Sequence, residues 1–231
     1  MSHGTHSHTK DGHSKNRILI VDDHPLFRRG IADLINTEPD MEVCGEADNG
    51  RTALEAIRAH DPHLVTVDIS LRGTANGIDL LKSIKAEHPK LPLLVLSMHE
   101  ESLYALRALR AGARGYIMKQ EALDRVMSAI RHVLEGQLYV SPSMSGRMIE
   151  EFVQGGASNG GSTITEKLTD RELEILQLIG HGRGVQQIAT DLNLSAKTVE
   201  THRAHIKEKL KFQTARELAR FAVQWVDQQV V

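Results

Sequence analysis

Acidic residues close two short apolar runs in the first half of this chain, at positions where they could share a metal ion. Asp22 and Asp23 directly follow the run Ile18–Val21, and Asp68 closes the run that begins at His63. If both runs are neighbouring parallel strands, the three carboxylates crowd one pocket at the carboxyl edge of the sheet. Such crowding is electrostatically costly unless a cation neutralises it. A hard divalent ion with oxygen ligands, such as Mg²⁺, is the natural partner.

Two further polar groups are expected at the same edge. Ser97 ends a later apolar run, and Lys119 follows the next one. The combined set suits phosphoryl transfer: Asp68 would attack phosphorus, while the metal and Lys119 offset charge on the phosphoryl oxygens. The product would draw Ser97 inward, which vacates space for the ring of Tyr116. Each residue alone would be read as a helix cap, a surface charge or a core ring, and their joint placement favours the chemistry.

The elements that would position these residues alternate along residues 17–136. Apolar runs typical of buried strands alternate with stretches whose apolar residues recur at helical spacing. The predicted strands are Ile18–Val21, Met41–Ala47, His63–Asp68, Leu91–Ser97 and Gly115–Met118. The predicted helices are a stretch after Asp23, then Gly50–His60, Gly77–His88, Glu101–Ala111 and Ala122–Glu135. This alternation predicts a flavodoxin-like α/β domain with a five-stranded parallel sheet of order 2-1-3-4-5, covered by helices on both faces.

The flanking segments have different compositions. Residues 1–16 are polar and hold four histidines, so we expect a disordered tail rather than a rigid metal site. Residues 137–164 are predicted to be a linker with a short helix near Met144–Val153, because residues 154–163 are rich in Gly and Ser. Residues 165–231 are predicted to form an all-α domain of four helices.

Helix caps and a tight turn define this second domain. Thr169 to Glu172 and Thr214 to Glu217 have the pattern of capping boxes, and Ser195 is placed to cap a third helix. A tight turn at Asp191–Ser195 would join the middle two helices. This arrangement predicts a helix-turn-helix.

The helix Ser195–Leu210 is the candidate DNA-reading element. Five basic residues stand against two acidic ones between Ser195 and Lys211, which is typical of phosphate binding. Val199, Ile206 and Leu210 share a face that should pack inward. The candidate DNA contacts lie outward or flank that face: Lys197, Glu200, Thr201, Arg203, Ala204, Lys207 and Lys211. His202 and His205 are interpreted as packing or phosphate-adjacent groups rather than metal ligands.

Several motifs carry a resemblance to a known family. VDDH (Val21–His24), VDISLRG (Val67–Gly73), LSMH (Leu96–His99) and GARGYIMK (Gly112–Lys119) resemble the receiver domain of two-component response regulators. LTDRELEILQLIGHG, QQIATDLNLS and KTVETHRAHIKEKL resemble the LuxR-type helix-turn-helix output domain of the NarL/FixJ subfamily. The resemblance extends over about residues 17–135 and 168–222.

The resemblance implies a DNA-binding transcriptional regulator that is not an enzyme beyond its own phosphorylation and dephosphorylation. Asp68 would be the phosphoacceptor, and Ser97, Tyr116 and Lys119 would form the switch and bind the phosphoryl group. The implied Mg²⁺ ligands are Asp22, Asp23, Asp68 and the carbonyl of Ser70. The implied partners are a histidine kinase that faces the first helix, double-stranded DNA, and a second copy of the chain, which pairs through the last helix when phosphorylated.

Other functions are weighed against this one. A Mg²⁺-dependent phosphatase of similar fold needs a second Asp two residues after the nucleophile, where this chain has Ser70. A phosphorylation-independent DNA-binding scaffold does not need the full acidic set, and RNA binding lacks an aromatic stacking platform. We expect a cytoplasmic protein without a membrane partner, because no apolar run is long enough to span a bilayer and Cys44 is the only cysteine.

Overall fold

The computed structural model describes residues 15–71, 76–121, 123–153 and 167–228. A five-stranded parallel sheet of order β2-β1-β3-β4-β5 forms the first domain, which confirms the predicted topology. The strands are β1 (Asn16–Val21), β2 (Met41–Ala47), β3 (Leu64–Val67), β4 (Leu93–Ser97) and β5 (Gly115–Met118). Parallel pairing places the carboxyl ends of β1 and β3 side by side, since Val21 pairs with Val67.

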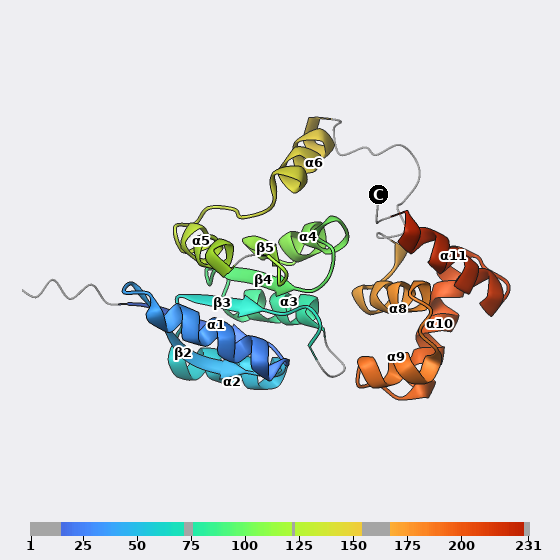
Figure 1. Cartoon of the computed structure of the whole chain (residues 1–231), viewed down its shortest axis with the longest axis horizontal. Helices are drawn as coiled ribbons and strands as arrows, with labels where there is room; N and C mark the ends of the chain where they lie inside the picture. Colours follow the sequence, from blue (N-terminus) through green and yellow to red (C-terminus); the bar gives the residue numbers. More distant parts are fainter. Residues whose placement is uncertain (1–14, 72–75, 122, 154–166, 229–231) are drawn as a thin grey trace, which may run out of the picture.

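Five helices cover the two faces of the sheet (Figure 1). They are α1 (Pro25–Thr37), α2 (Gly50–His60), α3 (Gly77–Glu87), α4 (Glu101–Arg110) and α5 (Leu123–Leu134). Alternate strand residues point to opposite faces. Ile18 and Ile20 of β1 pack with α1 and α5, whereas Leu19 and Val21 pack with α2, α3 and α4. Burial on both faces explains why the strands are continuous apolar runs in the sequence.

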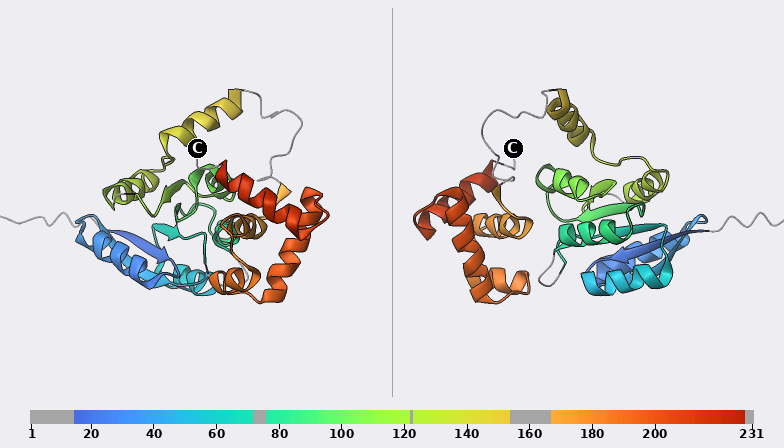
Figure 2. Two further views of the ribbon diagram at one scale, coloured as in Figure 1. Left: turned by 45° about the vertical axis from the view of Figure 1, so that its right-hand side comes forward. Right: turned by 180° about the vertical axis from the view of Figure 1, so that it is seen from behind.

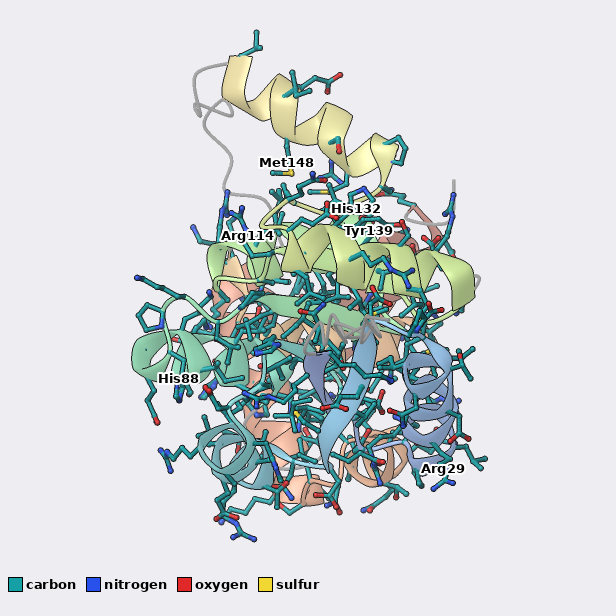
Figure 3. The ribbon with its side chains drawn as sticks, turned by 90° about the vertical axis from the view of Figure 1, so that its left-hand side faces the viewer. Arg29, His88, Arg114, His132, Tyr139 and Met148 are labelled. Carbon is teal, nitrogen blue, oxygen red and sulfur yellow. The ribbon has the colours of Figure 1, made fainter. Side chains whose placement is uncertain are left out.

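The chain after α5 returns to the sheet edge. Tyr139 bridges Gly115, and its carbonyl accepts a hydrogen bond of 2.9 Å from the amide of Tyr116. The ring of Tyr139 meets His132 of α5 edge-on, with centroids 5.6 Å apart (Figure 3). Helix α6 (Pro142–Val153) follows and begins two residues before the predicted Met144, with Met148 packed toward the receiver side.

Two expected features lie partly or wholly outside the described residues. Residues 1–14 of the His-rich tail and the Gly/Ser-rich stretch 154–163 are among the residues that the structure does not describe. Strand β1 begins at Asn16, inside the range that the sequence assigns to the tail. Cys44 is half-buried in β2, where burial raises the pKa of its thiol.

The second domain is helical, as predicted. It contains α8 (Asp170–Gly180), α9 (Val185–Asp191), α10 (Ala196–Leu210) and α11 (Ala215–Asp227). The capping boxes of Thr169 and Thr214 and the cap of Ser195 are all present. Asn193 adopts the left-handed conformation (φ 51°) in the turn between α9 and α10. These caps and this turn set the angle between α9 and α10 in the helix-turn-helix.

The two domains contact each other, with α8 on the side of the helical domain nearest the receiver (Figures 1 and 2). The apolar cluster that involves α3 and α4 continues into the core of α8, α10 and α11. Within the described residues, no helix is long and apolar enough to span a membrane.

Candidate functional site

Three carboxylates meet at the carboxyl edge of the sheet, where the sequence predicts them. Asp22 and Asp23 follow β1, and Asp68 follows β3. The exposed fractions are only 1% for Asp22, 9% for Asp23 and 1% for Asp68. A carboxylate oxygen of each lies within 4.8 Å of the others. The site is therefore a buried, acidic pocket at the point where the strand order reverses, between the neighbouring strands β1 and β3.

Lys119 closes this pocket from the end of β5. Its ammonium donates to Asp68 Oδ2 at 2.6 Å and lies 2.6 Å from Asp22 Oδ2. A backbone hydrogen bond of 2.8 Å from the Lys119 amide to the Ser97 carbonyl fixes the lysine against β4. One ammonium cannot balance three buried carboxylates, so the donor set and its charge fit a divalent cation with oxygen ligands.

Burial has the largest effect on the pKa of the Asp68 carboxyl. It raises the pKa of Asp68, an effect that the nearby Lys119 opposes and the charge of Asp22 reinforces. A carboxylate in this state is deprived of water, and its charge is stabilised mainly by Lys119. Added positive charge beside it would favour the ionised form, which is the nucleophilic form.

His24 also enters the pocket, which the sequence analysis missed. Its Nδ1 lies 2.8 Å from Asp23 Oδ1, 3.3 Å from Asp22 Oδ1 and 3.7 Å from Asp68 Oδ2. The side chain remains about half exposed at 54%. A histidine directly after two strand-end aspartates was the available signal, because it caps α1 and must lie beside them.

Ser97 and Tyr116 lie together beneath the loop that follows β4. The Ser97 hydroxyl accepts a hydrogen bond of 3.1 Å from the amide of His99. The Tyr116 hydroxyl donates to the carbonyl of His99 at 2.9 Å. Tyr116 is already buried here, and its burial raises the pKa of the phenol far above the ordinary value. The loop that contains His99 therefore holds the ring of Tyr116 inside, and a movement of this ring on phosphorylation stays a prediction.

His99 links the pocket to the second domain. Its Nε2 lies 2.7 Å from the hydroxyl of Ser70, whose amide donates to Asp68 Oδ1 at 3.1 Å. The same nitrogen lies 3.7 Å from Glu174 Oε1 on α8. The ring stacks on Tyr104 of α4 with centroids 4.5 Å apart. A chain of contacts thus runs from the loop after β3 to the helical domain.

Helices α4 and α8 make further contacts between the two domains. Arg107 of α4 pairs with Asp170, and its second nitrogen donates to the Leu168 carbonyl at 2.7 Å. The Tyr104 hydroxyl donates to Gln177 Oε1 at 3.0 Å. No sequence signal marked these residues, since the partners are more than 60 positions apart.

Glu174 is the buried acidic group of that contact, with 4% of the residue exposed. Burial alone would raise its pKa, but the neighbouring His99 and Arg171 outweigh burial and leave the pKa below the ordinary value. Glu174 is therefore ionised at neutral pH and holds its partners by charge.

Helix α10 presents the candidate DNA contacts as the helical periodicity predicts. Val199 and Ile206 are fully buried, and Leu210 is half-buried. Arg203 and Lys207 are half-buried at the flanks, with Arg203 paired to Glu200 at 3.2 Å. The remaining candidates are exposed: Lys197, Glu200, Thr201, Ala204 and Lys211.

Comparison with known proteins assigns each domain to a described family. The family described as "Response regulator receiver domain" matches residues 18–131. The family described as "Bacterial regulatory proteins, luxR family" matches residues 166–222.

Relatives match across most of the chain. The oxygen regulatory protein NreC of Staphylococcus carnosus is 35% identical over 209 residues, which cover 90% of this chain and 96% of that protein. RcsB of Salmonella enterica serovar Typhimurium, solved bound to a promoter with the phosphomimetic BeF3-, is 26% identical with a TM-score of 0.59. That match covers 90% of this chain and 98% of the RcsB chain. A LuxR-family response regulator from Aurantimonas sp. SI85-9A1 is 34% identical with a TM-score of 0.56, covering 61% of this chain and 99% of that one.

Proposed function

This chain belongs to the two-component response regulators with a LuxR-type output domain, and we propose that a histidine kinase phosphorylates it on Asp68 to control its pairing on DNA. As a member of that family it is a DNA-binding transcriptional regulator, not a classical enzyme. The observation that carries the proposal is the buried carboxylate of Asp68, positioned between Lys119 and two further acids.

The proposed chemistry is transfer of a phosphoryl group to one oxygen of Asp68. That oxygen forms a bond to phosphorus as the bond to the donor, phosphohistidine or a small acyl phosphate, breaks. Lys119 and the hydroxyl of Ser97 then bind phosphoryl oxygens. Asp22, Asp23, Asp68 and the Ser70 carbonyl would hold Mg²⁺, which neutralises the charge that develops on those oxygens. The receiver would catalyse only its own phosphorylation and dephosphorylation.

The surface of α1 is the proposed kinase contact. A shallow apolar hollow there is lined by Leu26, Phe27, Gly30, Ile31 and Leu34. Leu26 is 89% exposed, and Arg29 projects outward from the same helix (Figure 3). The ring of Phe27 faces the Lys119 ammonium, 4.6 Å from its centroid. A partner seated on α1 would therefore lie beside the pocket that accepts the phosphoryl group.

Phosphorylation is proposed to release the helical domain through the His99 loop. A phosphoryl group that engages the Ser97 hydroxyl withdraws the acceptor of the His99 amide. The same group crowds Ser70, which holds the His99 ring. Loss of these two restraints would move His99 away from Tyr104 and Glu174 and loosen the contact between α4 and α8.

The released domain is proposed to pair through α11 and to read double-stranded DNA with α10. Leu218, Ala222 and Trp225 of α11 are buried against the domain core, whereas Val223 on its outer side is 43% exposed. A symmetric pair would place two α10 helices against half-sites of inverted sequence. A DNA target places the proposed site of action in the cytoplasm.

The test is phosphorylation with acetyl phosphate and Mg²⁺, read by intact mass. We expect one phosphoryl adduct on the wild type and none on Asp68→Ala. Asp79→Ala is the matched control, because Asp79 is an exposed acid of the same domain. An adduct that persists in Asp68→Ala would contradict the assignment of the acceptor.

A further inference from the structure

A second group of side chains with possible metal-ligand atoms lies in the helical domain, far along the chain from the acidic pocket. Glu172 of α8 and His202 and His205 of α10 each offer one ligand atom, and these atoms lie within 4.8 Å of one another. The two histidines are three positions apart on α10, so they project from the same side of the helix. From the sequence, these histidines are interpreted as packing or phosphate-adjacent groups rather than metal ligands. That interpretation does not include Glu172, because only the tertiary structure brings Glu172 beside them.

His202 has an unused nitrogen. Its Nδ1 is buried and has no hydrogen-bond partner among the residues that the structure describes. Burial lowers the pKa of this imidazole. A buried polar atom without a partner is costly, and a metal ion would satisfy it.

Glu172 and His205 complete the group from two directions. Glu172 is buried, and its Oε2 accepts from the Thr169 amide at 2.8 Å and from the Lys209 ammonium at 2.6 Å. Its Oε1 faces His205 Nδ1 at 3.8 Å. The side chain of His205 is 54% exposed, so it is free to close the small remaining distance. Ligands of a tetrahedral zinc ion stand roughly 3.4 Å apart when the bonds are about 2.0–2.1 Å.

We propose that Glu172, His202 and His205 form a site for a borderline transition-metal cation such as Zn²⁺, with the fourth position open to water. Two imidazoles and one carboxylate are the ligands of such ions, whereas Mg²⁺ prefers the all-oxygen pocket of the receiver. The bound ion would tie α8 to α10, the helix that carries the candidate DNA contacts. Lys209 competes with it, since its ammonium already holds Glu172.

The experiment measures Zn²⁺ bound per chain by equilibrium dialysis, together with the melting temperature, in excess Mg²⁺ to fill the acidic pocket. The full chain is used in every case, so the tail histidines contribute equally to all variants. His205→Gln should bind one equivalent less than the wild type, or bind it at least about tenfold more weakly, and should lose the zinc-dependent rise in melting temperature. His181→Gln is the matched control, because it removes an exposed histidine from the same domain without touching the cluster.

A variant that should bind zinc more tightly provides the second test. Lys209→Gln removes the competing ammonium and should tighten zinc binding at this site. Equal zinc content and an equal thermal shift in the wild type and His205→Gln would overturn the site. Unchanged affinity in Lys209→Gln would overturn the competition between the ammonium and the metal.

Discussion

Asp68 lies in a pocket where burial and like charge both oppose ionisation. The pKa of its carboxyl is raised mainly by burial, and Lys119 supplies a compensating full charge at hydrogen-bond distance. Any cation that enters the pocket therefore binds the folded state in preference to the unfolded chain, in which the acids are separated and hydrated. Replacing one of these carboxylates should therefore change how much a divalent ion stabilises the folded chain.

Removal of one proposed ligand tests this response. Mg²⁺ at about ten times its dissociation constant should stabilise the wild type by about 1.4 kcal/mol, because it binds only the folded pocket. Asp23→Asn should lose most of that gain, as measured by thermal unfolding with and without Mg²⁺. Asp79→Asn, which changes an exposed acid, should keep it. An equal gain in Asp23→Asn would contradict the role of Asp23 as a ligand.

The start of α3 is packed tightly against the segment that follows β3. A Cβ atom placed on Gly77 would lie 2.1 Å from the carbonyl oxygen of Asp68 and 2.6 Å from the Cα of Ile69. These atoms belong to the backbone of the Asp68–Ile69 segment, which cannot yield easily, so only glycine allows α3 to begin this close to the site.

Two glycines give a matched test of that packing. Gly77→Ala should lower the free energy of unfolding by roughly 1–3 kcal/mol, because the new methyl group must displace backbone. Gly30→Ala in α1, where a Cβ would meet nothing within 4 Å, should be neutral or raise it by up to about 1 kcal/mol. Urea unfolding of both variants measures the difference. Similar effects of the two changes would rule out close packing as the cause.

The contact between α4 and α8 is a second element-level feature that can be tested. Arg107→Ala removes the pair with Asp170 and the bond to the Leu168 carbonyl. We expect this variant to separate the domains without phosphorylation, seen as a larger radius of gyration in small-angle scattering. Arg110→Ala, an exposed change on the same helix, should leave the radius unchanged. No change in Arg107→Ala would mean that this contact does not hold the domains together.

The elements were largely predictable because their signals are local. The strand runs, the caps of Thr169, Ser195 and Thr214, and the inward face of α10 depend on residues near in sequence. The acidic pocket was also predictable, since parallel strands bring their carboxyl ends to one edge. The links from His99 to Ser70 and Glu174 were not, because they join side chains from three distant segments with no shared pattern.

The whole molecule should bind DNA with a salt dependence set by exposed lysines. Removing one lysine that binds a DNA phosphate should reduce the slope of log affinity against log salt by about 0.9. Lys197→Ala, at the exposed start of α10, should reduce the slope by about that amount and weaken binding to all sequences. Lys90→Ala, an exposed change in the receiver, should not. The measurement is fluorescence anisotropy over a salt series.

The link between the acidic pocket and DNA recognition is tested by selecting bound sequences from a pool of random DNA duplexes. The wild type with acetyl phosphate and Mg²⁺ should enrich a motif of two inverted half-sites, because phosphorylation is proposed to release the output domains to pair. The unphosphorylated wild type and Asp68→Ala treated with acetyl phosphate should enrich it weakly or not at all. Equal enrichment of the same motif by Asp68→Ala would show that DNA recognition does not depend on the acidic pocket.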